Sequence, residues 1–416
     1  MKNARVVGVA LLLLAGSAVL EAKEVAEWNM AAIDMIKADG ISNHLGNRAM
    51  AMLHVAMFDA VNGIEDQYDP FLVDFRMPRA LPAEVVAASA AFEILTSLYP
   101  DREDVFRPLY ESHIAEEPQH PGKRPRMSYG RRLAIAYGRL VAQRVLQWRE
   151  NDGSAEAGAV PYPDGTEIGQ WRRTDARPPM MPGWGDVLPF AMTSGQQFRL
   201  IGPPDITGYE YARDYAEVMD MGGKTSSYRT AEQTEIARFW ISGIPRIWNL
   251  VAHQVCDAKD YGLLEEARLF ALLNVALADA QIVGWDMKYH FGFWRPVTAN
   301  AYADQDDNDY THPYPDWQSL LMVPAFPEYP SGHSTSCAAA ATVLAKFVGT
   351  DEFSFAVNSE ANPGLATRHF NSFWAAAREA GISRVYGGIH FNFSNAEGLE
   401  AGRSLGRYIC ENIMAE

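Results

Sequence analysis

The chain has 416 residues, of which 48% are hydrophobic and 21% are charged, and its formal net charge at pH 7 is −16. This length and composition allow one large buried core or two medium ones. The acidic balance excludes non-specific binding to nucleic acid or to anionic lipid, because both require positive charge. Three cysteines without a C-x-x-C pair indicate no zinc site and no disulfide framework, although a single disulfide stays open.

Residues 1–22 have the layout of a secretory signal peptide. Lys2 and Arg5 precede a short apolar run that ends in small residues, and this run is too short for a stable membrane span. An exported chain with so few cysteines fits a bacterial periplasm or culture medium better than it fits a disulfide-built extracellular domain. We therefore expect an exported bacterial protein, either periplasmic or secreted.

Apolar residues recur at helical spacing along most of the chain, whereas alternating strand-like runs are scarce. The predicted helices cover 24–39, 43–62, 82–99, 128–150, 208–220, 230–258, 263–290, 333–349, 364–380 and 395–412. Connections rich in Pro, Gly and Asp, at about 151–207 and 300–330, separate the helical groups. No internal repeat is visible, and the pattern predicts an all-α protein of one or two helical bundles.

We divide the predicted mature body, 23–416, into N-terminal helices at 23–207 and a helical bundle that carries the candidate site at 208–416. The composition and pattern indicate no particular oligomeric state.

The predicted helix 263–290 is apolar on nearly every face, which places it in the core of a bundle. Its end carries Lys288, with Trp285 one turn earlier on the same face. A lysine at such a position ordinarily reaches to water, unless a partner anion lies nearby. Arg295 follows seven residues after Lys288, and Pro296 is expected to stop the helix.

The stretch 326–347, "FPEYPSGHSTSCAAAATVLAKF", places Pro-Ser-Gly-His before an alanine-rich run of high helical propensity. Ser331 is a suitable N-cap, so Gly332 and His333 are predicted at the start of a helix. That end has unpaired N–H groups and the positive end of the helix dipole, which favour an oxyanion. Taken alone, the stretch fits an ordinary cap with an exposed histidine better than it fits an oxyanion site.

Further along, "GISRVYGGIHFNFSNAEG" supplies Arg384 and His390. With the earlier segments, the chain offers three cations, a hydroxyl, a helix start and two histidines. A tetrahedral oxyanion demands such a set, because each of its oxygens needs charge-assisted donors.

Three segments resemble the tripartite signature shared by vanadium-dependent haloperoxidases and the phosphatidic-acid-phosphatase-type (PAP2) acid phosphatases. They are Lys288-x6-Arg295-Pro296, Pro330-Ser331-Gly332-His333 and Ser383-Arg384-x5-His390. Each is weak alone, but all three in order within about a hundred residues are a strong signal. The stretch from Arg48, "RAMAMLHVAMFDAVNGIEDQYDPF", also resembles the N-terminal helices of secreted bacterial members. The resemblance implies helical bundles of the haloperoxidase and acid phosphatase type.

The resemblance implies a role for each site residue. The residues expected to hold the oxygens of orthovanadate or phosphate are Lys288, Arg295, Ser331, Gly332 and Arg384. His390 is implied as the axial vanadium ligand or as the nucleophile toward phosphorus, and His333 as the general acid–base.

Ser394 and Glu232 occupy two further positions that the family pattern assigns to the site. The family pattern has an aspartate four residues after the last histidine, where this chain has Ser394, so we expect a weaker orienting bond to His390 unless a backbone carbonyl substitutes. The segment "RTAEQTEIARFW" resembles the family segment that supplies an acidic partner to a site arginine, which assigns that role to Glu232.

The leading hypothesis is an exported vanadate-dependent haloperoxidase that oxidises halide with hydrogen peroxide and passes the hypohalous acid to a small organic acceptor. Trp285 and Phe326 favour it, because together they resemble the apolar halide wall of chloroperoxidase-type members. The alternative is a secreted acid phosphatase that cleaves a phosphate ester through a phosphohistidine at His390. A periplasmic oxyanion-binding protein is a third hypothesis, but it does not need both His333 and His390.

Overall fold

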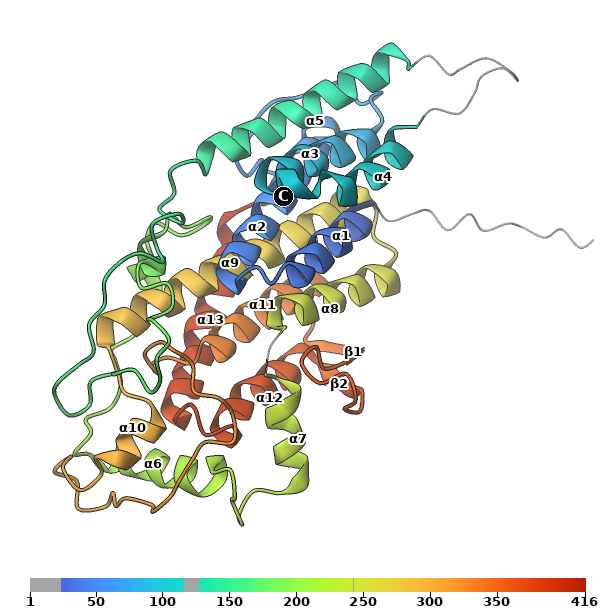
Figure 1. Ribbon diagram of the computed structural model, residues 1–416. Coiled ribbons are helices and arrows are strands. Elements are labelled where there is room, and N and C mark those ends of the chain that lie inside the picture. Colours follow the sequence, from blue (N-terminus) through green and yellow to red (C-terminus); the bar gives the residue numbers. More distant parts are fainter. Residues whose placement is uncertain (1–23, 116–126, 242) are drawn as a thin grey trace, which may run out of the picture.

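The computed structural model describes residues 24–115, 127–241 and 243–416 (Figure 1). The predicted signal peptide lies outside these residues. The α-helices are α1 (Glu24–Ala38), α2 (Asn43–Glu65), α3 (Ala83–Leu98), α4 (Glu103–Ile114), α5 (Tyr129–Trp148), α6 (Tyr209–Gly222), α7 (Ala231–Phe239), α8 (Ile244–Lys259), α9 (Leu263–Phe291), α10 (Pro296–Ala301), α11 (Gly332–Val348), α12 (Phe373–Tyr386) and α13 (Asn392–Asn412). Short 3-10 turns occur at Pro100–Arg102, Trp184–Asp186 and Gly195–Phe198. The predicted all-α class is confirmed.

One antiparallel hairpin departs from the prediction. Strands β1 (Glu352–Val357) and β2 (Arg368–Ser372) pair with Phe355 opposite Phe370. The sequence "EFSFAV" alternates apolar and polar residues, as a half-buried strand does, and this short signal was missed. The helix predicted at 364–380 therefore begins only at Phe373, where the Ser372 side chain caps it.

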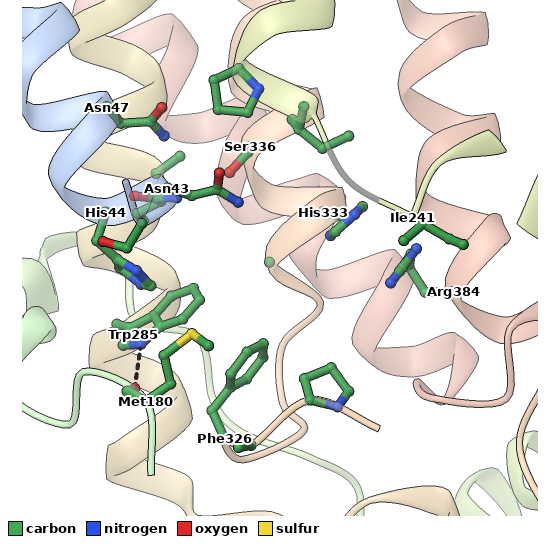
Figure 2. Close-up of a pocket in the computed structure, with 18 of the residues that line it drawn as sticks. Asn43, His44, Asn47, Met180, Ile241, Trp285, Phe326, His333, Ser336 and Arg384 are labelled. Atoms are coloured by element: carbon green, nitrogen blue, oxygen red, sulfur yellow. Dashed lines mark hydrogen bonds between the residues drawn. The ribbon is translucent and has the colours of Figure 1, made fainter. Parts of the chain in front are cut away.

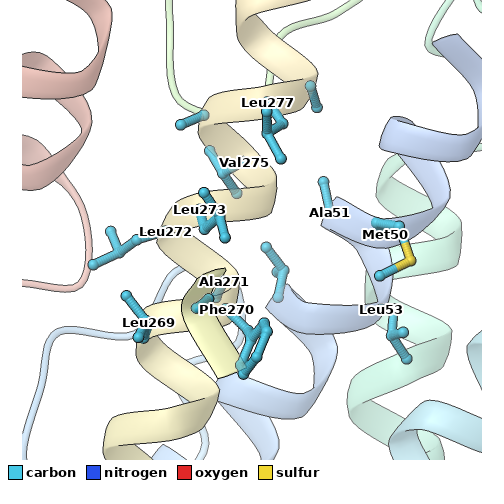
Figure 3. Packing of buried hydrophobic residues seen from close by; sticks show 14 of the residues in the cluster. Met50, Ala51, Leu53, Leu269, Phe270, Ala271, Leu272, Leu273, Val275 and Leu277 are labelled. Carbon is cyan, nitrogen blue, oxygen red and sulfur yellow. The ribbon is translucent and has the colours of Figure 1, made fainter. Parts of the chain in front are cut away.

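Helix α9 runs through the core and orders the rest of the molecule around it. It packs against α2, α8, α11 and α13, and Figure 3 shows apolar side chains of α2 and α9 between the two helices. Leu269, Leu273 and Leu277 are fully buried, and each buried leucine contributes about 1.5–3 kcal/mol. Within the part of the chain that the structure describes, only α9 is long and apolar enough to cross a membrane, and nearly all of it is covered by protein.

Helix α9 covers the predicted 263–290, but the residue that stops it differs from the prediction, and the predicted helix 230–258 is broken. Helix α9 ends at Phe291 because Gly292 adopts a left-handed conformation, with φ 56°, and caps it before Pro296 is reached. Pro296 instead begins α10. The predicted helix 230–258 is two helices, and the break between them includes Gly243, also left-handed with φ 86°. Both breaks lie next to the candidate site.

The close packing of α13 on α11 brings the last predicted motif to the start of α11. A Cβ atom at Gly398 would lie 2.7 Å from the Ser331 carbonyl oxygen, and one at Gly402 would overlap the Thr335 carbonyl. Only glycine permits this approach of backbones. As a result, the Ser331 N–H donates to the Ser394 carbonyl over 3.0 Å, which ties the two helix starts together.

Candidate active site

The site is a cavity of about 570 Å³. Its walls come from the starts of α2 and α11, the last turns of α9, the loop before α11, and the end of α12. Figure 2 shows His333 and Arg384 on one side of the cavity, and His44, Asn47 and Trp285 on the other. The cavity therefore uses residues from both parts of the predicted body, 23–207 and 208–416.

Ser331 is the N-cap of α11, as predicted. Its Oγ accepts a hydrogen bond from the Ser334 N–H over 3.3 Å and lies 2.9 Å from the Ser334 Oγ. The Ser334 Oγ also lies 2.9 Å from Oδ1 of Asn395, which can only accept, so the single Ser334 hydrogen goes to Asn395 and the Ser331 hydroxyl donates to Ser334.

Gly332 belongs to the cradle, defined as the residues expected to hold an oxyanion: Lys288, Arg295, Ser331, Gly332 and Arg384. A Cβ atom at this position would lie 3.6 Å from Cζ3 of Trp285 and 3.8 Å from Cε of Lys288, in ordinary van der Waals contact with both. Gly332 lines the cavity, so the lack of a side chain leaves the start of α11 open to an anion.

Lys288 is fully buried and does not reach to water. Its Nζ donates to the carbonyl oxygens of Pro327 over 3.3 Å and Glu328 over 2.9 Å, and also to that of Pro330. Burial, together with the nearby positive charge of Arg295, lowers the pKa of Lys288 well below its usual value. The loop before α11 thus wraps the lysine, which lies behind Trp285 and Phe326 and is not among the residues that line the cavity.

Arg295 and Arg384 are also buried. Arg295 donates from Nε to the Phe326 carbonyl over 3.0 Å and from a terminal nitrogen to the Ile389 carbonyl over 2.7 Å. Burial lowers the pKa of Arg295 to about 9 and that of Arg384 to about 10. The Nε of Arg384 is buried without a hydrogen-bond partner, so it retains a donor for a ligand.

The charges around the cradle do not balance. Within the described residues, the buried basic side chains of Lys288, Arg295 and Arg384 are accompanied by one buried carboxyl group, that of Glu328, whose pKa burial raises to about 7. Burying unpaired cations is costly, and a bound anion offsets that cost. In addition, no group of three or more His, Cys, Asp or Glu side chains in the described ranges is arranged for a metal cation. The donor set is that of an oxyanion site.

His390 lies on the cradle with its two ring nitrogens in different environments. Nδ1 is 2.7 Å from a carboxylate oxygen of Glu328, and Nε2 is 3.1 Å from a terminal nitrogen of Arg295. Because a carboxylate accepts and a guanidinium donates, the ring hydrogen is on Nδ1 and Nε2 presents its lone pair. Burial, followed by the Arg295 charge, lowers the pKa of His390 well below its usual value, which keeps the ring neutral.

His333 follows Gly332 on the first turn of α11 and lines the cavity. Its Nε2 contacts the Trp240 carbonyl oxygen at 3.0 Å, and the same oxygen accepts from Arg384 over 2.9 Å. Burial, followed by the Arg384 charge, lowers the pKa of His333. The ring is therefore neutral, and because a carbonyl oxygen only accepts, Nε2 carries the ring hydrogen and Nδ1 is the nitrogen with a lone pair.

Trp285 and Phe326 meet as the sequence predicts. Their ring centroids are 5.0 Å apart, and both line the cavity. The Nζ of Lys288 lies 5.1 Å from the centre of the Phe326 ring. The two rings thus form an apolar wall directly beside the buried cations.

The prediction for Glu232 is wrong. Its side chain is 62% exposed and pairs with Arg368 over 2.8 Å, and neither residue lines the cavity. The resemblance of the segment placed Glu232 on helix α7, but it did not indicate which face of the helix Glu232 occupies. The carboxylate beside a site arginine is that of Glu328, which the sequence reasoning missed although "FPEYPSGH" contains it.

The expectation of a weakly oriented His390 is also wrong. Ser394 does not leave the ring without a carboxylate, because Glu328 reaches the same nitrogen from the loop before α11. An acidic residue just before the Pro-Ser-Gly-His motif, combined with the missing aspartate at 394, was the available signal.

Comparison with known proteins agrees with this geometry. The family model described as "VCPO second helical-bundle domain" matches residues 268–415. Vanadium chloroperoxidase of Curvularia inaequalis is 26% identical over 468 aligned positions, which cover 85% of this chain and 74% of that protein. The crystal structure of the first bacterial vanadium-dependent iodoperoxidase is 28% identical, with a TM-score of 0.79 over 95% of this chain and 97% of its own.

The holo form of a bacterial vanadium-dependent chloroperoxidase has the same fold. Its TM-score is 0.70 at 18% identity, over 89% of this chain and 91% of its own. The predicted resemblance to vanadium-dependent haloperoxidases and the predicted helical-bundle fold are confirmed.

Proposed function

We propose that this chain, which is related to the vanadium haloperoxidases, is an exported vanadate-dependent enzyme that oxidises halide with hydrogen peroxide to hypohalous acid. The observation that supports it best is the buried surplus of positive charge beside two neutral histidines and an aromatic wall. A site built only to bind an oxyanion needs the cations but neither the second histidine nor the wall.

The residues of the cradle fit orthovanadate. Those that would hold it are Lys288, Arg295, Arg384, Ser331, the Gly332 N–H and, through Nε2, His390. Bound vanadate supplies the Lewis acidity that activates hydrogen peroxide without a change in metal oxidation state. The free donor on Arg384 and the open space at Gly332 are the structural observations that support the fit.

His333 is the proton-transfer group of the proposed reaction. It lines the cavity next to Arg384, and because Nε2 faces the Trp240 carbonyl, Nδ1 is the nitrogen that would take a proton from hydrogen peroxide. General acid–base groups of this kind contribute about 10²–10⁴-fold to the rate.

The wall of Trp285 and Phe326 is the proposed halide site. Apolar rings beside the buried Lys288 remove water from a small anion while the positive charge attracts it. We propose that the enzyme oxidises both bromide and chloride, with chloride favoured at mildly acidic pH.

The cavity also has room for a small organic acceptor. Its volume of about 570 Å³ lies within the usual range for small-molecule sites, about 300–1,000 Å³, and is far larger than peroxide and halide need. An acceptor that enters it meets the hypohalous acid where it is formed.

Four activities of the purified chain lacking residues 1–22 test the proposal: halide oxidation by peroxide and hydrolysis of an aryl phosphate, each with and without orthovanadate. We expect halide oxidation that depends on vanadate, in assays with chloride, bromide and iodide. Hydrolysis of the ester in the absence of vanadate, with no halide oxidation, would instead establish the acid phosphatase. Vanadate binding without any turnover would establish an oxyanion-binding protein.

The proposed export has a separate test. The charged, apolar and small-residue zones of 1–22 follow one another as a leader does, so protein recovered from periplasm or medium should lack the first 18–22 residues, about the usual leader length. N-terminal sequencing checks this, and an intact Met1 on the exported protein contradicts it.

A further inference from the structure

The carboxylate of Glu328 makes contacts that converge on His390. One oxygen lies 2.7 Å from Nδ1 of His390 and accepts from the Phe391 N–H over 3.0 Å. The other accepts from the Ser394 hydroxyl over 2.6 Å. Glu328 is fully buried, so these contacts exclude water and fix the carboxylate in one orientation.

The backbone around Glu328 is held as firmly as its side chain. The Glu328 N–H donates to the Phe293 carbonyl over 2.9 Å, and its carbonyl accepts from Lys288 over 2.9 Å. The next residue, Tyr329, is fully buried and its hydroxyl bonds Glu397 of α13. The loop before α11 is therefore fastened both to the end of α9 and to α13, on which Ser394 lies.

We propose that Glu328 is the positioning residue of His390, and that this chain has moved the orienting carboxylate from position 394 to the loop at 328. Ser394 then serves as the donor that holds the moved carboxylate. The hydrogen on Nδ1 fixes the tautomer, and the lone pair of Nε2 is aimed at the cradle, where the proposed function requires a vanadium ligand. Groups that orient a metal-binding histidine in this way typically contribute 10–100-fold in affinity.

A simpler role for Glu328 is that of a countercharge to Lys288 and Arg295, and the two roles predict opposite results. If Glu328 only offsets buried positive charge, Glu328→Ala and Glu328→Gln both make the cradle more positive and bind orthovanadate more tightly. If Glu328 positions the ring, Glu328→Ala weakens orthovanadate binding by about 10–100-fold. Glu328→Gln, which keeps an oxygen for Nδ1–H, binds more tightly than Glu328→Ala.

A double variant that returns the carboxylate to position 394 gives the most discriminating test. The Ser394 hydroxyl already touches the carboxylate that contacts His390, so an aspartate there is within reach of the same nitrogen. We expect Glu328→Ala/Ser394→Asp to recover most of the orthovanadate affinity lost by Glu328→Ala. Glu232→Ala is the matched control, because it removes an exposed glutamate remote from the cradle, and it should leave the affinity unchanged.

A readout in the protein without vanadate separates this proposal from the proposed function. Nitrogen-15 NMR of labelled histidine reports which ring nitrogen of His390 carries the hydrogen. We expect the Nδ1–H form in the parent, Glu328→Gln and the double variant, and a mixture of tautomers in Glu328→Ala. An unchanged tautomer in Glu328→Ala, or tighter orthovanadate binding by both single variants, overturns the positioning role whether or not the enzyme oxidises halide.

Discussion

Helices α2 and α9 each carry a buried aspartate that binds the backbone of a loop, but the two helices end differently. Asp59 of α2 accepts hydrogen bonds from three consecutive backbone N–H groups, those of 71–73, over 2.7–2.9 Å. Asp279 of α9 does the same with 190–192, over 2.7–3.3 Å. The sequences around them, "HVAMFDA" at 54–60 and "NVALADA" at 274–280, are alike. This local similarity was not detected as a repeat.

The difference lies beyond the aspartates. Helix α2 ends at Glu65, soon after Asp59, whereas α9 continues from Asp279 to Phe291 and carries Lys288 in its extra turns. In both helices a buried carboxylate fastens a loop, and only in α9 does the helix then enter the site. The two helices thus share an aspartate that holds a loop, and the candidate site residue Lys288 lies on the turns of α9 that continue beyond its aspartate.

The largest expected effects are those of replacing His333 and His390, which lie outside the two loops held by Asp59 and Asp279. His390→Ala should abolish vanadium binding, because it removes the side chain that would hold vanadium in the proposed function. His333→Ala should keep vanadium and lose about 10²–10⁴-fold of the turnover. The test is to measure the vanadium content and the halide oxidation rate of both purified variants. Stoichiometric vanadium in His390→Ala would show that His390 does not hold vanadium.

Replacing the two aspartates separates scaffold from site. An asparagine cannot accept from all three N–H groups, so Asp59→Asn and Asp279→Asn should each lower the free energy of unfolding by about 1–3 kcal/mol. Only Asp279→Asn should also slow halide oxidation per folded molecule, because 190–192 belongs to the connection that packs on the last turns of α9. Urea unfolding and steady-state rates measure the two effects. Equal loss of activity in both variants would contradict the distinction.

The same carboxyl groups give a pH dependence of stability. Burial raises the pKa of Asp59 and of Asp279 to about 6 in the folded chain, despite the three N–H donors. Unfolded aspartate titrates near about 3.9, so each group stabilises most below about pH 4 and loses its contribution as the pH rises through 6. The loss is on the order of 1–3 kcal/mol for each group.

Asparagine variants isolate this pH effect. The fall in unfolding free energy between pH 4 and pH 7 should be smaller in Asp59→Asn and Asp279→Asn than in the parent. A larger fall in the variants would mean that the N–H groups favour the ionised carboxylate and lower its pKa.

The sequence predicted what local pattern and spacing determine. The Ser331 cap, the course of α9 and the convergence of Arg384 with His390 follow from propensity and motif order. The sequence did not predict the role of Glu328, because this role depends on where the loop before α11 lies against α13. That position is set by tertiary contacts such as the bond from Ser394 and the close approach at Gly398.

The errors have the same physical origin. Glu232 was assigned from a segment, but the face of α7 that meets the site is decided by packing. The burial of Lys288 could not be predicted from its helix alone, because the carbonyl oxygens of a distant loop accept its hydrogen bonds inside the core. Helix propensity likewise hid the hairpin β1–β2, whose strands are stabilised by stacked phenylalanines such as Phe353 and Phe373.

The smallest expected effect concerns the choice of halide at the end of α9. Phe326 packs on Trp285, which lies in the last turns that distinguish α9 from α2. Chloride is harder to oxidise than bromide and is held more strongly by water, so it gains more from a dry wall. Phe326→His places a polar ring beside Lys288 and should lower chloride turnover more than bromide turnover. Phe75→His is a suitable control, because that ring lies outside the cavity and is 53% exposed. Rates for both halides in the parent and the two variants decide the matter, and a chloride-to-bromide ratio that Phe326→His leaves unchanged would remove Phe326 from the halide site.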